Sequence, residues 1–326
     1  MTNVRMGLIG TGKMGRYHLN LYEEINELSL AGVCDINNDK ISGIGAKYGV
    51  KCTKDYRELL KNVDAVTIAV PTQLHYEIAK TCLEAGKHVL IEKPITTVFE
   101  EAEELFDIAE KKQLVLNIGH VERFNGAVQE LEKIVHKPYI VESRRVGPFD
   151  NRTSGNSIVL DLLIHDIDII LNIVGANVIS VHATGSPVYS NMPDFANVSL
   201  TFDNNAVAST MVSRVSHKKD RTLGISQEDA YILLDYTSQD INIYRKGQSQ
   251  HIFGNRELKY KNEYILERLF VYKDNPLKLE IKYFIDSILG KKDRMVTVEH
   301  ELMSLKIALN VDEFLMHKNK NMRVYD

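Results

Sequence analysis

The sequence predicts an α/β Rossmann domain over residues 1–120, followed by an α+β domain over residues 121–326. Three observations lead to this prediction. Short β-rich runs alternate with helix-period segments in the first part of the chain, which is typical of a parallel sheet with crossover helices. A glycine-rich turn directly follows the first run. After about residue 120 longer segments of alternating hydrophobicity appear, and these indicate an antiparallel sheet with one solvent-exposed face.

The strands expected in the first domain are nearly all apolar, as strands are when helices cover both faces of a parallel sheet. They are Arg5–Ile9, Leu30–Cys34, Ala65–Val70, His88–Ile91 and Val115–Ile118. The helical patterns that connect or follow them are Gly15–Glu24, Asn38–Lys47, Leu74–Ala85 and Phe99–Lys111.

The second domain is expected to begin with a helix over Asn125–Val135, an extended run over Tyr139–Val146 and a loop over Pro148–Ser157. An apolar helix, Ile158–Val174, then ends at Gly175, a residue suited to the left-handed conformation after a helix. The expected sheet strands are Asn177–Gly185, Phe195–Asp203, Ala206–Val215 and Tyr231–Asp235. Asp203, Asn204 and Asn205 predict a tight hairpin between two of them. A last helix, at about residues 298–318, is expected to pack back on the first domain.

Composition and charge exclude several classes of function. The chain is 44% hydrophobic and 26% charged, the balance of a globular protein. Its net charge of −4 provides no basic field to hold nucleic acid or an anionic membrane. The first residues do not resemble a secretory signal. Three cysteines without a CxxC pair argue against a disulfide framework or a structural zinc site. We therefore expect a cytoplasmic protein.

The glycine-rich turn, Gly10 to Gly15, follows an expected strand and opens an expected helix. In a dinucleotide-binding unit Gly10 permits the tight turn, Gly12 lets a pyrophosphate approach the backbone, and Gly15 allows close packing of helix and strand. The anion then lies at unpaired N–H groups of the helix N-terminus. The residues expected to contact the dinucleotide here are Gly10, Thr11, Gly12, Lys13 and Met14.

Asp35 lies 20 residues beyond Gly15, at the end of the second expected strand. A carboxylate at this place accepts hydrogen bonds from ribose hydroxyls and repels a 2′-phosphate, so NAD is favoured over NADP. Ile36, Asn37 and Asn38 offer no arginine for such a phosphate, although Lys40 is near. The alternative is that Asp35 is only a turn residue.

Residues Gly7 to Lys13 also fit the start of a P-loop. Met14 occupies the Ser/Thr position of that motif and cannot bind magnesium, so a kinase or ATPase is not supported.

Two further segments indicate catalysis. Ile91-Glu92-Lys93-Pro94 follows an expected strand, at the carboxyl end where ligands bind in open α/β sheets. Asp161, His165 and Asp168 are spaced to share one face of an otherwise apolar helix, where polar groups are costly unless paired or functional. Structural roles are the alternative for each segment. Metal binding would suit Asp and His as well, but no companion motif supports it, and no metal is expected.

These segments together resemble the glucose-fructose oxidoreductase, inositol dehydrogenase and MocA family over essentially the whole chain. The motifs are GTGKMG at 10–15, AVPTQLH at 69–75, EKP at 92–94 and the Asp161–His165 pair. The resemblance implies a second domain with a large open mixed sheet, homodimers or homotetramers formed through it, and metal-free hydride transfer between NAD(P) and a sugar or cyclitol.

The resemblance also implies roles for individual residues. Lys93 and His165 would be the catalytic pair, and Asp161 would hold substrate hydroxyls. His165 is expected to be the immediate base and Lys93 to steady charge on the reacting oxygen, although the two roles could be exchanged. The resemblance further implies contacts with the dinucleotide from Pro71, Thr72, His75, Glu92 and Lys93.

The stretch from Asn117 to Asn125 resembles a narrower branch that acts on nucleotide sugars, the UDP-N-acetylglucosamine 3-dehydrogenases. Substrate contacts are expected from Asn117, His120, Arg123, Arg152, Asp161 and His165. Arg144 and Arg145 are further candidates for a diphosphate, with ordinary surface charge as the alternative. A free-sugar or inositol dehydrogenase, or a regulatory protein that binds NAD and sugar without catalysis, are the competing functions.

Overall fold

The computed structural model describes residues 3–150, 155–247, 250–254, 257–261 and 264–317; Arg152 lies outside these ranges. The chain forms two compact units. The first contains residues 1–124 and 275–309, and the second contains residues 125–274 and 310–326. The segment after residue 274 therefore returns to the unit in which the chain began.

The first unit is built on a six-stranded parallel sheet in the order β3-β2-β1-β4-β5-β6. Its strands are β1 Val4–Ile9, β2 Leu28–Cys34, β3 Lys51–Thr53, β4 Ala65–Ile68, β5 His88–Glu92 and β6 Leu116–Gly119. This strand order is that of a dinucleotide-binding Rossmann fold, so the predicted fold class is confirmed. The short strand β3 was not expected from the sequence, because its three residues are partly exposed and carry no apolar run.

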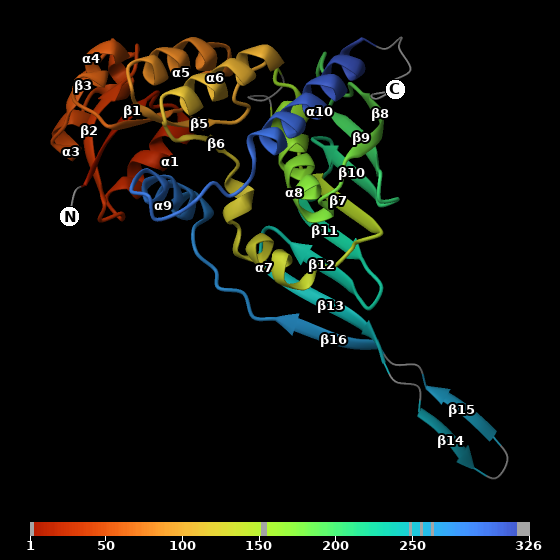
Figure 1. Cartoon of the computed structure of the whole chain (residues 1–326). Helices are drawn as coiled ribbons and strands as arrows, with labels where there is room; N and C mark the ends of the chain where they lie inside the picture. Colours follow the sequence, from red (N-terminus) through yellow and green to blue (C-terminus); the bar gives the residue numbers. More distant parts are fainter. Residues whose placement is uncertain (1–2, 151–154, 248–249, 255–256, 262–263, 318–326) are drawn as a thin grey trace. The chain divides into compact units, whose positions relative to one another are not determined.

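Helices cover both faces of this sheet. The longer ones are α1 Lys13–Tyr22, α5 His75–Glu84, α6 Phe99–Lys111 and α9 Pro276–Ile288, and the shorter ones are α2 Asn38–Ile41, α3 Ile44–Tyr48, α4 Tyr56–Leu60, η1 Thr72–Leu74 and η2 Val121–Phe124. Figure 1 shows α5 and α6 side by side on one face, with α1 and α9 on the other. From α9, Ile281 and Phe284 are fully buried in the same apolar core as Met6 and Leu8 of β1.

One expected helix of this unit is wrong. The segment Asn38–Lys47 was predicted as a single helix, but it is divided into α2 and α3. Gly43 interrupts it with φ +83°, a backbone conformation that glycine adopts without the steric cost other residues meet.

The second unit contains an eight-stranded sheet in the order β16-β13-β12-β11-β7-β10-β9-β8. Its strands are β7 Ile140–Val146, β8 Val178–Ser186, β9 Phe195–Phe202, β10 Val207–Ser213, β11 Asp220–Ser226, β12 Tyr231–Asp235, β13 Asp240–Lys246 and β16 Tyr264–Leu269. The neighbours pair antiparallel except β7 and β10, which are parallel, so the sheet is mixed and mostly antiparallel as predicted. A separate hairpin pairs β14 Gln250–Gly254 with β15 Glu257–Lys261.

The predicted hairpin at Asp203 to Asn205 is present between β9 and β10. Asn205 adopts φ +68°, and the amide of Phe202 donates to the carbonyl of Ala206 at 3.0 Å. The side chain of Asn204 accepts from the amide of Ala206, which further fixes the turn.

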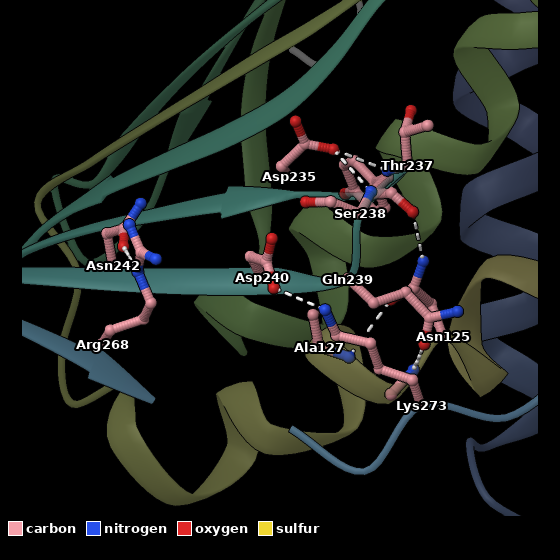
Figure 2. Close-up of polar contacts among 12 residues, drawn as sticks. Asn125, Ala127, Asp235, Thr237, Ser238, Gln239, Asp240, Asn242, Arg268 and Lys273 are labelled. Carbon is pink, nitrogen blue, oxygen red and sulfur yellow. Dashed lines mark hydrogen bonds and ion pairs between the residues drawn. The ribbon is translucent and has the colours of Figure 1, made fainter. Parts of the chain in front are cut away.

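Two helices of the second unit, α7 Gly126–Ile134 and α8 Ile164–Val174, contact each other. Asn125 caps α7 by accepting from the amide of Ala127 at 3.1 Å, and its amide group donates to the carbonyl of Tyr236 at 2.9 Å (Figure 2). In the same region Asp235 accepts hydrogen bonds from the amides of Thr237 and Ser238, which closes the turn from β12 to β13.

The last helix, α10 Val298–Met316, contributes residues to both units. Within the first unit, the ammonium group of Lys306 lies 5.6 Å from the centre of the Phe99 ring. Among the helices that the structure describes, none combines the length and apolar character needed to cross a bilayer.

Candidate active site

The three glycines of the turn between β1 and α1 differ in what surrounds them. Gly10 has φ +93°, and a Cβ there would lie 2.4 Å from the carbonyl oxygen of Ala69. A Cβ on Gly15 would lie 2.0 Å from the carbonyl oxygen of Gly10. A Cβ on Gly12 would meet nothing within 4 Å. The protein therefore leaves open space beside Gly12, at the N-terminus of α1, where helix N–H groups lack intrahelical acceptors. This arrangement fits the diphosphate of a dinucleotide.

Asp35 lies directly after β2 and is almost buried, with 9% of its surface exposed. Its Oδ2 atom accepts hydrogen bonds from the amide and the hydroxyl of Thr11, and its Oδ1 atom accepts from the amide of Asn37. Burial raises the pKa of Asp35, but the hydrogen bonds from Asn37 and Thr11 outweigh it, and the net pKa is lowered. A carboxylate has about four lone-pair sites, so one remains for a ribose hydroxyl.

His75 links the two loops that carry the expected cofactor residues. Its Nδ1 atom lies 2.8 Å from the carbonyl oxygen of Pro94, and its Nε2 atom lies 3.0 Å from that of Val70. Val70 precedes Pro71 and Thr72, and Pro94 follows Lys93 across a cis peptide bond. His75 is 1% exposed. We therefore interpret it as a support for both loops, and its contact with the dinucleotide stays a prediction.

Glu92, at the end of β5, is held by a residue that sequence reasoning missed. The Nε2 atom of His18 in α1 lies 2.7 Å from Oε1 of Glu92, and the His18 side chain is 1% exposed. A Cβ on Gly119 would lie 3.2 Å from Oε2, so the neighbouring strand also approaches this carboxylate closely. Glu92 is thereby fixed beside Lys93, at the carboxyl edge of the sheet.

The predicted substrate residues Asn117, His120 and Arg123 lie in a polar cluster of the first unit. Arg123 donates two hydrogen bonds to Glu301 of α10, both at 2.8 Å. His120 is buried, and its Nε2 atom lies 3.7 Å from Oε2 of Glu301. Asn117 and Arg123 line a cavity of about 20 Å³, which has room for about one water molecule. Sequence spacing gave no sign of Glu301, which is 178 residues from Arg123.

The same cavity is lined by Glu280 of α9. Glu280 is 1% exposed, and neither carboxyl oxygen has a hydrogen-bond partner among the described residues. Burial raises its pKa well above the usual value, with the nearby charges of Glu92 and Glu301 adding to the effect and Arg123 opposing it. Burial and these neighbouring charges therefore favour the protonated, neutral form of Glu280 in the folded protein.

In the second unit the helix that carries Asp161 and His165 is not regular. It was predicted as one α-helix from Ile158, but its first turns form a π-helix, η4 Val159–Leu163, before α8 begins. Such wider turns are frequent at functional sites, and they change which side chains share a face. Asp161 is 33% exposed in its side chain, His165 is half-buried and Asp168 is buried. The stripe of polar residues therefore runs from the surface into the core.

Two neighbours fix the start of η4. The hydroxyl of Ser157 accepts from the amides of Val159 and Leu160, both at 3.1 Å, and itself donates to Asp312. Arg214, which follows β10, donates to the carbonyl of Asn156 at 2.9 Å and lies 3.5 Å from Oδ2 of Asp161. Arg214 is another residue that the sequence analysis did not single out.

The two arginines of β7 have different environments. Arg144 is half-exposed and pairs with Asp220 at 3.2 Å. Arg145 is 2% exposed, forms two hydrogen bonds with the buried Asp166, and lies over the ring of Tyr236. Arg145 is therefore committed to the core of its unit, and the suggestion that it could contact a diphosphate is not supported by its burial.

Comparison with known proteins agrees with this geometry. Residues 4–120 match an oxidoreductase family with an NAD-binding Rossmann fold, and residues 125–233 match the C-terminal domain of the same family. The chain is 36% identical to UDP-N-acetylglucosamine 3-dehydrogenase of Acidithiobacillus ferrooxidans over 76% of this chain and 79% of that protein. The chain belongs to the glucose-fructose oxidoreductase, inositol dehydrogenase and MocA family.

Two further comparisons extend over nearly the whole length of the chain. A crystal structure of the Acidithiobacillus ferrooxidans UDP-N-acetylglucosamine 3-dehydrogenase superposes with a TM-score of 0.85 at 31% identity, covering 97% of this chain and 99% of that one. The myo-inositol 2-dehydrogenase of Thermotoga maritima is 28% identical over 97% of both chains. The protein is thus an NAD(P)-dependent dehydrogenase, as the sequence predicted, and NAD is the cofactor of its family.

Proposed function

We propose that this family member oxidises the 3-hydroxyl group of the sugar in UDP-N-acetylglucosamine and that NAD accepts the hydride. The observation that carries the proposal is the similarity to UDP-N-acetylglucosamine 3-dehydrogenase in sequence and in fold, over nearly the full length of that protein's structure. A free cyclitol substrate is the second candidate, favoured by the similarity to myo-inositol 2-dehydrogenase.

The geometry of the first unit supports NAD binding by named residues. The open space beside Gly12 and the N-terminus of α1 would receive the diphosphate, with Gly10, Thr11, Lys13 and Met14 around it. Asp35 would accept a ribose hydroxyl. Pro71, Thr72 and Glu92 lie at the carboxyl ends of β4 and β5, where a ligand of such a sheet binds. When bound, NAD supplies the hydride acceptor.

The chemical step needs a proton acceptor and a donor to the reacting oxygen. We assign the first role to His165, which takes the hydroxyl proton while the hydride leaves the same carbinol carbon, so that the hydroxyl becomes a ketone. Lys93 donates a hydrogen bond to the oxygen on which negative charge develops. Asp161 binds a substrate hydroxyl, and Arg214 holds Asp161 in place. Asn117, His120 and Arg123 are proposed as further substrate contacts.

We also propose that the protein forms a homodimer or homotetramer through the open face of the eight-stranded sheet. Residues that lie opposite one another on neighbouring strands form a row across six strands of this sheet. In order, they are Val207, Ile140, Ser226, Tyr231, Tyr244 and Leu266. All but Ser226 are apolar or aromatic, and Val207, Ile140, Tyr231 and Leu266 are exposed. A contiguous exposed apolar row of this kind is typical of a surface that another subunit covers.

The substrate is tested by following NADH absorbance with the purified protein. UDP-N-acetylglucosamine is offered first, then myo-inositol and glucose, and the oxidised product is identified by mass spectrometry. NADH formation from the nucleotide sugar alone is the expected result. Turnover of inositol or glucose instead would show that the substrate is a free cyclitol or sugar. Binding of a sugar without NADH formation from any of the three compounds would indicate a non-catalytic regulator.

The catalytic assignment is tested with Lys93→Ala and His165→Ala. Loss of a positioned acid or base commonly lowers the rate by about 10²–10⁴-fold, and we expect such losses while NAD still binds. Lys61→Ala and His182→Ala remove an exposed lysine and an exposed histidine elsewhere and serve as matched controls. Parent-like turnover in both catalytic variants would refute the assignment.

A further inference from the structure

The second unit contains a cavity that none of the expected site residues lines. It has a volume of about 350 Å³, within the range of about 300–1,000 Å³ typical of small-molecule sites. It is lined by Pro148, Phe149, Tyr189, Val215, Ser216 and His217. The lining residues come from the chain after β7, the loop between β8 and β9, and the chain after β10.

The aromatic part of this cavity is held in place by hydrogen bonds. Asp194, which is fully buried, accepts from the amides of Val188, Tyr189 and Ser190, at 2.6 to 2.9 Å. These bonds fix the backbone of Tyr189, whose side chain remains 60% exposed. The ring of Phe149 packs edge-on against that of Tyr189, with 5.3 Å between their centres. The loop thus presents an aromatic ring to the cavity in a defined position.

The other wall is continuous with the residues that hold Asp161. Arg214 lies against Asp161, and the next three residues, Val215 to His217, line the cavity. The amide of Ser216 donates to the carbonyl of Gly147 at 3.1 Å, which joins this wall to the one that carries Phe149. Three residues of chain span at most about 10 Å, so the cavity lies close to the proposed sugar site.

The loop beyond this wall is cationic. His217, Lys218 and Lys219 are consecutive and exposed. Lys218 and Lys219 thus present two ammonium groups to the solvent. The hydroxyl of Ser216 accepts from the amide of Lys218 at 3.3 Å and donates to its carbonyl at 2.9 Å, so the start of the loop is ordered. An anionic group beside the cavity would meet these positive charges.

We propose that this cavity binds the nucleobase of the nucleotide-sugar substrate, with the base stacked on Tyr189 and the diphosphate beside the loop from His217 to Lys219. This inference rests on the proposed function. It adds a binding site for the nucleobase, a part of the substrate that does not take part in oxidation of the sugar. A flat heterocycle stacks on an aromatic face whatever its identity. The neighbouring cations match the phosphates that follow the base, which distinguishes a nucleotide from an apolar ring compound.

The experiment is a calorimetric titration of the full-length protein with UDP and, separately, with inorganic pyrophosphate. Stacking on an aromatic side chain is worth a factor of about 5 to 150 in affinity, so Tyr189→Ala should raise the Kd of UDP by that factor and leave the Kd of pyrophosphate unchanged. Tyr189→Phe keeps the ring and should bind UDP like the parent. Tyr272→Ala removes another tyrosine, 75% exposed and outside the cavity, and is the matched control.

The proposal is overturned if Tyr189→Ala binds UDP like the parent, or if UDP and pyrophosphate lose affinity equally. Failure of this proposal can be distinguished from failure of the proposed function. NADH formation from UDP-N-acetylglucosamine with unchanged kcat/KM in Tyr189→Ala would retain the enzyme and reject the base site. Weaker UDP binding by Tyr189→Ala, without oxidation of UDP-N-acetylglucosamine by the parent, would retain the base site and reject the reaction.

Discussion

Thr11 donates two hydrogen bonds to one oxygen of Asp35, because its amide nitrogen and its hydroxyl both lie 2.8 Å from Oδ2. The glycine turn after β1 and the end of β2 are thereby tied together at a negative charge. This charge is suited to a ribose hydroxyl and opposes a 2′-phosphate. The contact connects the geometry of the turn to the choice between NAD and NADP.

Asp35→Asn should weaken NAD binding and reduce the preference for NAD over NADP. The substitution keeps the size of the side chain but removes its charge, and hydrogen bonds to a charged group are worth about 1.5–3 kcal/mol, so the KM for NAD should rise about tenfold or more. Steady-state kinetics with both cofactors measure the ratio. Asp39→Asn, at an exposed carboxylate of α2, is the control. An unchanged cofactor ratio in Asp35→Asn would contradict the assignment.

His75→Ala should lower kcat without moving the pH–rate profile. Burial lowers the pKa of His75, with hydrogen bonds to Pro94 and Val70 opposing the shift. The neutral ring, which donates to one of the two carbonyls at a time, is therefore favoured near pH 7. Loss of its support would displace the Lys93 loop, and a displacement of about 1 Å can cost up to about 10²-fold in rate.

His75→Asn places an amide nitrogen near the position of Nδ1 and should restore part of the rate, since it can still donate to the carbonyl of Pro94. Activity measured across the pH range distinguishes the two roles. A shifted profile in His75→Ala would show that the imidazole titrates with the reaction and is more than a support.

Glu280→Gln should stabilise the first unit at neutral pH. In the unfolded chain Glu280 ionises near the usual pKa of about 4.3, whereas burial keeps it protonated in the folded chain to a much higher pH. The folded state therefore loses stability as pH rises above the unfolded pKa. Glutamine cannot ionise and avoids this loss.

Calorimetry at about pH 4 and about pH 8 tests this linkage. The variant should melt higher than the parent at the upper pH, where each kcal/mol moves Tm by roughly 2–4 °C, and the difference should disappear at the lower pH. The same difference in Tm at both pH values would show that folding does not raise the pKa of Glu280.

Arg145→Met should destabilise the second unit severely, because it leaves the fully buried Asp166 charged and unpaired. Removing one partner of such a pair costs about 3–5 kcal/mol, whereas replacing both with apolar residues is often neutral. The double variant with Asp166→Leu should therefore recover most of the loss. Urea unfolding followed by circular dichroism measures both, and Arg144→Met, on the exposed side of β7, is the control. A mild effect of Arg145→Met would reject a structural role for this arginine.

Ile140→Asp should reduce the size of the oligomer. Ile140 is 47% exposed and lies in the apolar row on the open sheet face, between Val207 and Ser226. A carboxylate at a subunit interface would be buried without a partner, which is costly. Sedimentation velocity measures the assembly, and Val98→Asp, at a valine of the first unit that is 43% exposed, is the control. A parent that is monomeric, or an Ile140→Asp variant that assembles normally, would reject the interface.

Features that depend on nearby residues were predictable from the sequence. Helix α6 begins and ends where the apolar period predicts, at Phe99 and Lys111. The glycine turn and Asp35 follow from spacing alone, because a short loop and one strand place them together. The hairpin at Asp203 to Asn205 likewise requires only local backbone chemistry.

Features that depend on distant contacts were not predictable. Helix α9 enters the first unit after 150 residues of the second, and no local pattern assigns it there. The pairing of Arg123 with Glu301 and the position of Arg214 beside Asp161 arise from tertiary packing. The π-helical turn at η4 lies in a segment whose apolar period reads as an ordinary helix. Asp194 fixes the Tyr189 loop, but in the sequence it cannot be distinguished from an ordinary turn residue.

The surroundings of Gly10, Gly12 and Gly15 separate what the fold demands of this motif from what its ligand demands. Backbone atoms would reject a side chain at Gly10 or Gly15 in any version of the protein, with or without a nucleotide. Position 12 has an ordinary φ of −65° and empty space around it. A related protein that no longer bound the coenzyme would still need glycine at positions 10 and 15, but it could accept another residue at position 12. Of the three glycines, therefore, only Gly12 is explained by the ligand and not by the packing of the fold.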